Sequence, residues 1–545
     1  MRCGQPLMSE PAATLAAPPS QKSRFLRNVI WSWTGVGVNI LLGVFLSPIL
    51  VHKLGVAQYG IWVVFFSTMD YLRVLDFGLR AAVINRCARQ STQQDWRGVN
   101  ETINTAILYF LAMSAIGCAF ALLFRGPAMT LFKIEPSLQP DARLLLVVIA
   151  LSISARLIFS PVTAALEALQ RYDLINRAYI GNLTVRAVGS LALLLSGHGL
   201  LPLGYLVLAV AVGEDLWNLL SLRRVFAELH LSPRLISRDA FRALVDYGKH
   251  SSVLNAASMV ELQVPATVLG SMCGPTEVAF FALPWRLLMY TTEAFTKVGQ
   301  ITASVAAGLD VRRDARNVWT MAVATNRNCL SLFMPVAIFC CVYATPLLTV
   351  WVSPEVGQRS GAVLPVLVVP FLLAIAAQFN SGAVLMGQAK LRTYAWSLVA
   401  EVVLMIVVSV IVAPRYGAYG VAWVVSASLT TIRGAFLAVL LCRANRFSIS
   451  AYLTAIYARP LAAAVPVALM TAALRLTVLP GRNWFELLTA TPSLPRAAST
   501  CKSCRRESRA GPKSSRRVRV TPACRFTPHA CWRSWPRRRP PTRSL

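Results

Sequence analysis

The stretch from Asn28 to Arg89 decides the fold. It begins with the apolar run NVIWSWTGVGVNILLGVFLSPILV (28–51), breaks at HKLGVAQYG (52–60) and continues as a second apolar run (61–88). Each run is about as long as the ~20 residues that a helix needs to cross the hydrocarbon core. The second run carries four ionisable residues, Asp70, Arg73, Asp76 and Arg80. Because charges are costly in lipid, we expect these side chains to face a bundle interior or a water-filled cavity.

The composition of the chain also predicts a membrane protein. Of its 545 residues, 56% are hydrophobic and only 14% are charged, whereas soluble domains carry about 25% charged residues. The mean hydropathy is +0.56. The net charge of +31 sits in short loops and in the C-terminal tail, so we predict no nucleic-acid partner. The 12 cysteines are scattered and show no disulfide framework.

Thirteen apolar spans can be drawn along the chain, and they predict an all-α, polytopic integral membrane protein. The spans are residues 29–51, 60–86, 103–124, 142–166, 180–197, 203–221, 251–272, 278–305, 319–345, 362–386, 394–413, 418–441 and 454–478.

Lys and Arg residues are distributed unevenly between the loops that join these spans. The even-numbered loops hold nineteen of them and the odd-numbered loops hold seven. Because loops rich in Lys and Arg stay in the cytoplasm, we predict a multi-pass protein of the cell inner membrane with a cytoplasmic N-terminus. A misplaced span would scramble the alternation after it, so the agreement supports the span count.

The pattern divides the chain into six segments. We predict a disordered cytoplasmic lead (1–27), an N-terminal six-helix lobe (28–221), a basic cytoplasmic linker loop (222–250), a C-terminal six-helix lobe (251–441), an extra transmembrane helix with its flanks (442–495) and a basic tail (496–545). A Gly-containing break followed by an aromatic residue occurs after both the first and the seventh span. Such internal repeats are common in secondary transporters, whose substrate site lies at the repeat interface.

The tail, residues 496–545, has fifteen Lys or Arg against one acid, Glu507. Two interpretations are open. The tail is disordered and touches anionic lipid, or it results from a reading-frame shift in a GC-rich gene, which gives such Arg-, Pro-, Ser- and Cys-rich sequence. We favour the second, because the composition changes where a further span would begin. We predict no metal site from its cysteines and histidine, Cys501, Cys504, Cys524, Cys531 and His529.

Three motifs carry a family resemblance: PILVHKLGVAQYGIW (48–62), LDFGL (75–79) and YGAYGVA (416–422). They resemble the polysaccharide-biosynthesis flippases of the MOP superfamily, which export O-antigen and exopolysaccharide precursors on a lipid carrier. The resemblance covers about residues 22–480. It implies 12–14 transmembrane helices in two pseudo-symmetric lobes that work by alternating access.

The leading functional hypothesis follows from this resemblance. It is a flippase that moves an undecaprenyl-diphosphate-linked oligosaccharide across the cytoplasmic membrane for O-antigen or exopolysaccharide assembly, coupled to an ion gradient or the membrane potential. The expected partners are the lipid-linked oligosaccharide, membrane lipids, a polysaccharide polymerase and chain-length proteins. We expect no cofactor.

A diphosphate that crosses hydrocarbon needs cations, and Arg binds phosphate oxygens with two parallel hydrogen bonds. We therefore predict three cavity cations, Arg80, Arg286 and Arg73, with Arg156, Arg186, Arg327 and Arg433 as further candidates. Arg73 and Arg80 are seven residues apart, which places them on nearly one face of a continuous helix. The alternative is a structural role, with Arg73 paired to Asp70 or Asp76. Arg80 would then pair with Asp76, and Arg433 with another helix.

Six acids in or beside the spans are candidates to bind a coupling proton or sodium ion: Asp76, Glu214, Asp215, Glu261, Glu293 and Glu401. A carboxylate inside a membrane span is expensive and is often functional. Asp76 and Glu261 are our main candidates. The structural alternative for Glu261 is a hydrogen bond to another helix.

Two other functions are open. A multidrug or metabolite antiporter of the same superfamily would favour acidic residues over arginines in its cavity. A membrane glycosyltransferase or polymerase needs a set of carboxylates or a large catalytic loop, but the loops between the spans are short. We also see no nucleotide-binding motif, so we predict no enzyme and no catalytic residue.

Overall fold

The computed structural model describes residues 21–311, 314–388 and 392–477, together with positions 481, 483, 486 and 487. All of the secondary-structure elements in this part of the chain are helical, which confirms the predicted all-α fold. The predicted tail and the first twenty residues of the predicted lead lie outside the described residues, and so does the Cys and His set of the tail.

Helices of the first half follow one another through short turns. They are α1 (Gln21–Leu54), α2 (Val56–Asp70), η1 (Tyr71–Asp76), α3 (Leu79–Thr92), α4 (Trp96–Phe124), α5 (Pro127–Leu131), η2 (Pro136–Leu138), α6 (Gln139–Ala168), α7 (Tyr172–Leu195) and α8 (Leu200–Val225). Because α1 begins at Gln21, the prediction that the lead extends to residue 27 is wrong.

Helices of the second half follow a loop that contains η3 (Pro233–Leu235). They are α9 (Arg238–Met272), α10 (Pro275–Val311), α11 (Ala315–Val342), α12 (Ala344–Trp351), α13 (Pro354–Ser360), α14 (Val363–Pro370), η4 (Phe371–Ala376), α15 (Ala377–Gly387), α16 (Arg392–Leu429), η5 (Thr430–Phe436), α17 (Leu437–Asn445) and α18 (Ile449–Thr477). The linker loop is thus shorter than the predicted 222–250, since α9 begins at Arg238.

Nine helical stretches of the described chain are long and apolar enough to cross a membrane. They contain ten of the thirteen predicted spans, because Thr393–Asn445 holds two of them, divided at the non-helical Gly417. The other three predicted spans, 60–86, 251–272 and 278–305, lie on α2 with α3, on α9 and on α10. Helices α2 and α3 are shorter than 18 residues, and parts of α9 and α10 lie outside the residues whose side chains the structure describes. All three spans hold charged residues, and we call their helices the charged helices.

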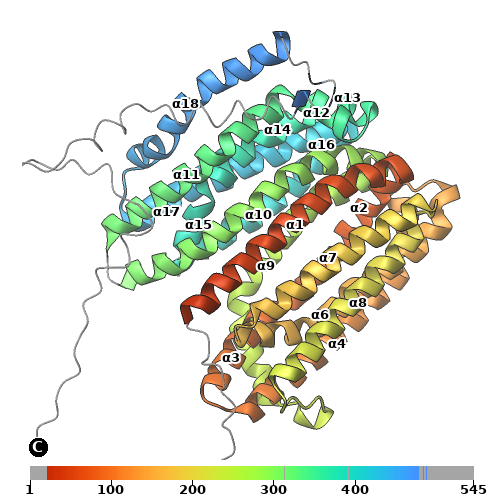
Figure 1. Cartoon of the computed structure of the whole chain (residues 1–545), viewed down its shortest axis with the longest axis vertical. Helices are drawn as coiled ribbons and strands as arrows, with labels where there is room; N and C mark the ends of the chain where they lie inside the picture. Colours follow the sequence, from red (N-terminus) through yellow and green to blue (C-terminus); the bar gives the residue numbers. More distant parts are fainter. Residues whose placement is uncertain are drawn as a thin grey trace, which may run out of the picture. The chain divides into compact units, whose positions relative to one another are not determined.

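The apolar helices pack into two groups. In the first group, α6 contacts α3, α4 and α8, while α7 contacts α1 and α8. In the second group, α10 contacts α15, α11 contacts α18, and α14 contacts α16. Figure 1 shows the first group in the orange and yellow part of the chain and the second in the green and blue part. The charged helices join the groups, because α2 packs against α9 and α10 and α3 packs against α9.

The join between α2 and α10 is unusually close. A Cβ atom placed on Gly60 of α2 would lie 1.8 Å from the carbonyl oxygen of Pro275, at the start of α10. Only glycine therefore lets the two helix backbones approach this far, as small residues do at helix contacts in membranes. This gives a physical reason for the last glycine of the LGVAQYG sequence.

Two π-helical segments, η4 and η5, pack against each other inside the second group. Such segments often occur at functional sites and leave a backbone carbonyl without its usual helical partner. The hydroxyl of Tyr457, on α18, donates a hydrogen bond to the carbonyl of Leu373 at 2.7 Å. The hydroxyl of Tyr452 lies 3.0 Å from the amide nitrogen of Asn326. The extra helix α18 is thereby joined to the second group by buried hydrogen bonds.

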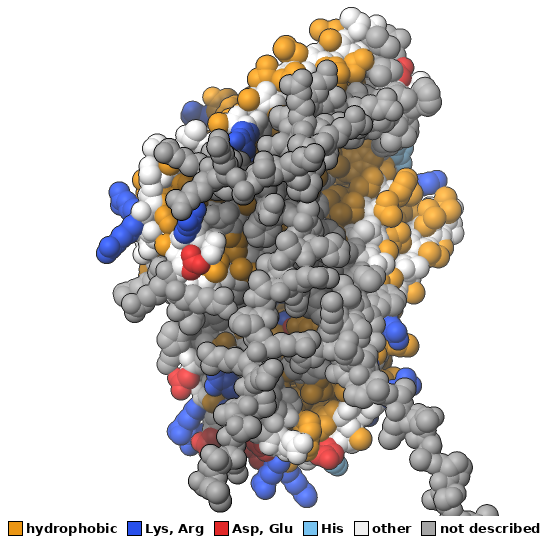
Figure 2. Space-filling model, turned by 60° about the vertical axis from the view of Figure 1, so that its left-hand side comes forward, with side chains coloured by type: hydrophobic (Ala, Val, Ile, Leu, Met, Phe, Trp, Pro, Cys, Tyr) orange, Lys and Arg blue, Asp and Glu red, His pale blue; other side chains and the backbone are white. Residues whose placement is uncertain are grey.

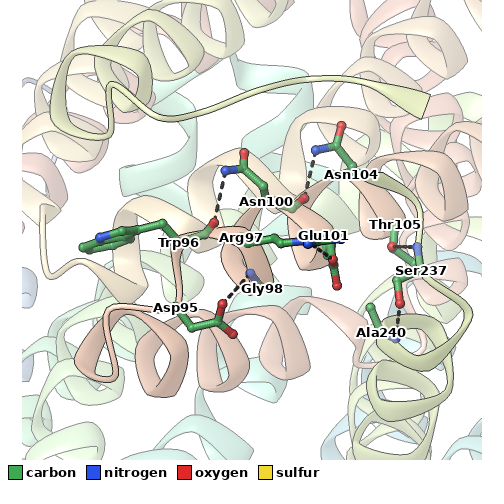
Figure 3. A network of polar contacts seen from close by, with 10 residues as sticks. All are labelled: Asp95, Trp96, Arg97, Gly98, Asn100, Glu101, Asn104, Thr105, Ser237 and Ala240. Atoms are coloured by element: carbon green, nitrogen blue, oxygen red, sulfur yellow. Dashed lines mark hydrogen bonds and ion pairs between the residues drawn. The ribbon is translucent and has the colours of Figure 1, made fainter. Parts of the chain in front are cut away.

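The loop between α8 and α9 is held against α4 by polar side chains of α4, and Figure 3 shows one of these contacts, from the backbone N–H of Ser237 to the hydroxyl of Thr105 at 3.0 Å. Asn100 donates to the carbonyl of Glu228 at 2.9 Å and accepts from the backbone N–H of His230 at 2.8 Å. Asn104 donates to the carbonyl of His230 at 2.8 Å and accepts from the N–H of Ser232 at 2.9 Å. We call these four bonds the asparagine clamp. The loop is therefore docked on α4 instead of swinging freely.

The surface of the described chain separates charge from apolar area (Figure 2). On the face shown, hydrophobic side chains cover much of the upper and right-hand flank, and Lys and Arg side chains lie along the left and lower edges and also at several points of the upper and right-hand flank. Exposed apolar residues include Leu123 at 79%, Leu332 at 72% and Leu469 at 67%. Such areas are unfavourable in water and are expected where a protein faces lipid.

The clamp gives a first prediction. The variant Asn100→Ala with Asn104→Ala removes four hydrogen bonds, each worth about 1 kcal/mol. We expect trypsin to cut the purified protein after Arg234, which is exposed, more than tenfold faster, because cleavage follows local opening. The control is Arg97→Ala, which removes a salt bridge of an 84% exposed side chain in the same region and should not change the rate. An unchanged rate in the double variant would contradict the clamp.

Candidate functional site

The predicted span 60–86 is not one helix. Helix α2 ends at Asp70, the 3-10 helix η1 follows, and α3 starts at Leu79. Between them, Phe77 and Gly78 have φ of 43° and 69°, in the left-handed region. The prediction that Arg73 and Arg80 share one face of a continuous helix is therefore wrong, since the break lies between them.

Contacts from other helices hold this break in place. The amide of Gln263, on α9, donates to Asp70 at 3.0 Å. The hydroxyl of Tyr109, on α4, donates to the carbonyl of Leu75 at 2.9 Å. Asp76 accepts the backbone N–H of Arg80 at 3.0 Å, so it caps the first turn of α3. The sequence LDFGL thus forms a capped corner whose polar groups are satisfied.

A cavity of about 480 Å³ lies beside this corner. Its charged lining consists of four arginines and four acids: Arg73, Arg80, Arg156, Arg186, Asp70, Asp76, Glu214 and Asp215. Hydroxyl and amide groups also line it, from Ser152, Ser160, Thr163 and Asn182. The residues come from α2, η1, α3, α6, α7 and α8, with Met259 from α9. Two of the three predicted cavity cations, Arg73 and Arg80, therefore line one polar cavity.

Three of the cavity arginines are neutralised by acids. Arg73 lies 3.4 Å from Asp70, which confirms that structural alternative. Arg80 does not pair with Asp76 through its guanidinium, which instead lies 2.7 Å from Glu167 on α6. The predicted Arg80–Asp76 pair is therefore wrong.

Arg156 completes the set of neutralised arginines, 2.7 Å from Glu214 on α8. In each of the three cases the positive charge is matched by one carboxylate.

Arg186 and Arg286 differ from these arginines. Within the described chain neither of them has an ion pair with an acid. Arg186 is half-buried on α7, and Arg286 on α10 is exposed although it lies deep in the bundle. The positive charge of Arg286 acts on Arg186. Arg186 lines the polar cavity and Arg286 does not, and the charges of Arg156 and Glu214 also act on Arg186.

Arg286 is held by a tyrosine. Its Nε donates to the hydroxyl of Tyr290 at 3.2 Å, one turn further along α10. A Cβ atom on Gly43 of α1 would lie 1.9 Å from that hydroxyl. Gly43 therefore leaves the room that Tyr290 needs to hold Arg286, and Tyr59 of α2 also lies beside this guanidinium.

A second charged cluster lies in the second helix group and is not part of the cavity lining. Arg433, in η5, hydrogen-bonds Glu261 of α9, and its Nε lies 3.9 Å from Glu401 of α16. We call these residues the Glu261–Arg433–Glu401 triad. The Glu401 side chain is fully buried, and neither of its carboxylate oxygens has a hydrogen-bond partner among the described residues. The structural alternatives for Glu261 and Arg433, contacts to another helix, are confirmed.

The triad carries two acids and one base, so full ionisation leaves one uncompensated negative charge in the bundle. Such a charge is expensive when buried. A single proton would neutralise the cluster. The predicted acid Asp76 has a capping role in this geometry, and the side chain of Glu293 lies outside the described part of the chain.

Several partners in these sites were not among the predicted residues. Glu167 is 87 residues from Arg80, and no local pattern connects them. Tyr290 follows Arg286 by four residues, and this helical spacing was a usable signal. Arg327 does not line the polar cavity.

Comparisons with known proteins agree with this architecture. A solved structure titled as the inward closed conformation of the lipid II flippase MurJ matches with a TM-score of 0.65 at 12% identity, covering 87% of this chain and 98% of that one. An inward-facing multidrug resistance MATE family transporter of the MOP superfamily matches with a TM-score of 0.62 at 15% identity, covering 79% and 99%.

A MOP superfamily transporter from Pyrococcus furiosus, whose title reports a reverse polarity of its binding pocket, matches with a TM-score of 0.57 at 16% identity, covering 79% and 96%. At these identities the likeness shows the fold. No curated protein sequence matches. The sequence profile described as "Polysaccharide biosynthesis protein" matches residues 25–300, about half of the chain. The chain therefore belongs to the polysaccharide biosynthesis protein family, built on the fold of the MOP superfamily transporters.

Proposed function

We propose that this protein is a flippase for an undecaprenyl-diphosphate-linked oligosaccharide that acts by alternating access between its two helix groups. The observation that carries the proposal is that Arg186, in the polar cavity, and Arg286, on α10, have no ion pair with an acid among the described residues. The family match supports a role in polysaccharide biosynthesis. A polymerase and chain-length proteins as partners stay predictions.

The two arginines suit a diphosphate. Each guanidinium can bind phosphate oxygens through paired, charge-assisted hydrogen bonds. Arg73, Arg80 and Arg156 should attract a diphosphate more weakly, because each of them already forms an ion pair with an acid. We therefore move the main anion site from the predicted Arg80 to Arg286 with Arg186, and assign Arg80 a structural role.

The neighbouring cavity suits the sugars. Its volume of about 480 Å³ falls within the usual range of small-molecule sites. The hydroxyl groups of Ser152, Ser160 and Thr163 and the amide of Asn182 provide hydrogen-bond partners for sugar hydroxyls. The diphosphate at Arg286 and Arg186 would thus leave the glycan beside a polar wall instead of in lipid.

One observation favours the alternative of an antiporter for an organic cation. Asp215 lines the cavity, and its Oδ2 atom is buried without a hydrogen-bond partner among the described residues. A cationic drug or metabolite would satisfy that oxygen. We place this function second, because Arg186 would repel such a ligand within the same cavity.

Replacing either unpaired arginine tests the proposed function. Arg286→Ala or Arg186→Ala should weaken diphosphate binding by about 10- to 100-fold, since hydrogen bonds to charged groups contribute about 1.5–3 kcal/mol. Surface polysaccharide in a strain without its own flippase should fall while protein abundance in the membrane stays normal. Lys at either position should restore part of the export, because it keeps the charge but loses the two-point contact.

The matched comparison is Arg80→Ala, which leaves Glu167 without its partner and should lower abundance. Adding Glu167→Gln should restore abundance by removing the unpaired charge. Normal export by Arg286→Ala, together with ethidium efflux that depends on Asp215, would favour the antiporter.

For the coupling step, we assign the transported proton to the Glu261–Arg433–Glu401 triad, with Glu401 as its main acceptor. The variant Glu401→Gln mimics the neutral acid permanently. In proteoliposomes, a pH gradient should accelerate transport by the wild type, and this acceleration should be lost in Glu401→Gln. The control Glu228→Gln changes an exposed acid of the α8–α9 loop and should keep it. Acceleration by a sodium gradient alone would contradict proton coupling.

The orientation of the chain is a further prediction. We expect the α8–α9 loop in the cytoplasm and α13 on the opposite side, from the distribution of Lys and Arg. In a background without other reactive cysteines, Arg359→Cys should react with a membrane-impermeant maleimide in intact spheroplasts. Arg234→Cys should react only after permeabilisation; both positions are exposed. The reverse labelling pattern would invert the orientation.

A further inference from the structure

The polar cavity contains a carboxylate that the described part of the protein does not satisfy. Asp215, on α8, lines the cavity and is only 4% exposed. Its Oδ2 atom is buried and has no hydrogen-bond partner among the described residues. Arg156 and Glu214 act electrostatically on Asp215, but they form an ion pair with each other at 2.7 Å. A buried acceptor without a donor is costly, so a donor from a ligand would stabilise this site.

A second acceptor on the same face of α8 is in the same situation. Asn218 follows Asp215 by three residues, so the two side chains are neighbours on the helix surface. Asn218 is 1% exposed, and its Oδ1 atom is buried without a partner in the part of the chain that the structure describes. The described helices therefore supply no donor to either of these two oxygen atoms.

Two hydroxyl groups of the cavity wall also present acceptors, because their protons are already used. Ser152 and Thr163, both on α6, donate to backbone carbonyls of that helix at 2.7 and 2.9 Å. A hydroxyl that donates its proton keeps lone pairs that can accept. Together with Asp215, these two groups make a wall of acceptors. Such a wall favours a ligand that brings hydrogen-bond donors.

We propose that Asp215 is a specificity-determining residue that accepts hydrogen bonds from the sugar next to the diphosphate, from its hydroxyl groups or its acetamido N–H. This inference rests on the proposed function and adds the feature of the glycan that the protein recognises. Arg186 lines the same cavity, so the anionic diphosphate and the donor groups of the sugar can be bound together.

The charge of Asp215 makes this recognition selective. Hydrogen bonds to an ionised acceptor are about twice as strong as those between neutral groups. A sugar that lacks the donor would bind weakly, because the buried carboxylate would then stay unpaired. We therefore expect discrimination against deoxy, O-methyl and O-acetyl sugars at the position that faces Asp215.

The test measures binding to the purified full chain in detergent. The probes are inorganic diphosphate and the 1-diphosphates of glucose, galactose, N-acetylglucosamine and N-acetylgalactosamine. At least one sugar diphosphate should bind the wild type at least tenfold more tightly than inorganic diphosphate does. Asp215→Ala should reduce this ratio of affinities below threefold. The control Ser221→Ala changes another buried residue of α8, outside the cavity lining, and should keep the ratio.

Analogues of the sugar that binds best give a second measurement if Asp215→Ala does not fold. In each analogue, hydrogen replaces one hydroxyl or the acetamido group. One analogue should bind the wild type at least tenfold more weakly than the parent compound. In Asp215→Asn, which keeps the shape but loses the charge, the same replacement should weaken binding less than threefold. Equal losses in both proteins for every analogue would overturn the inference.

The outcomes separate the two proposals. If inorganic diphosphate does not bind, or binds equally to the double variant Arg186→Ala with Arg286→Ala, the proposed function fails and this inference fails with it. If diphosphate binds through these arginines but no sugar improves the affinity, only the recognition by Asp215 is overturned. The same holds if the improvement persists in Asp215→Ala.

Discussion

The structure depends on one constraint, which is that each charge inside an apolar bundle must be paired or hydrated. Charged residues lie on the helices that join the two groups, which are α2 with η1 and α3, α9 and α10, and also on α6, α7, α8, α16 and η5. Arg80 with Glu167 and Arg156 with Glu214 satisfy the constraint by pairing. Water can reach Arg286, which satisfies it by hydration. Paired charges therefore occur both at the join between the groups and within the first group.

Pairing also separates structural from binding groups. A guanidinium that is already matched by a carboxylate attracts a further anion weakly, whereas Arg186 and Arg286 retain their full charge. The Glu261–Arg433–Glu401 triad shows the opposite imbalance, with one acid in excess. In the proposed function, the arginines without an ion pair bind the anion and the triad binds the proton. Alternating access requires that such sites change exposure together.

The sequence predicted the apolar helices well because hydropathy is a local property. Ten of the thirteen predicted spans lie in helices that meet the apolar criterion. It failed at residues 71–78, where the left-handed Phe77 and Gly78 depend on contacts from Gln263 and Tyr109 on distant helices. It also missed the partner of Arg80, because Glu167 is 87 residues away. Arg286 was predicted from its position in an apolar span, but whether an acid of the described chain pairs with it depends on the packing of distant helices.

The asparagine clamp limits how the two helix groups can move. Because the α8–α9 loop is hydrogen-bonded to α4, it cannot act as a flexible linker between the two helix groups. Helix α9 begins at this fixed loop, and it also packs against α16 of the second group. Any rotation of one group against the other must then bend α9 itself. Pro265 lacks a backbone N–H and interrupts the hydrogen bonding of α9, which makes it the natural hinge. Movement of one helix group relative to the other would then bend α9 at Pro265 and leave the α8–α9 loop in place on α4.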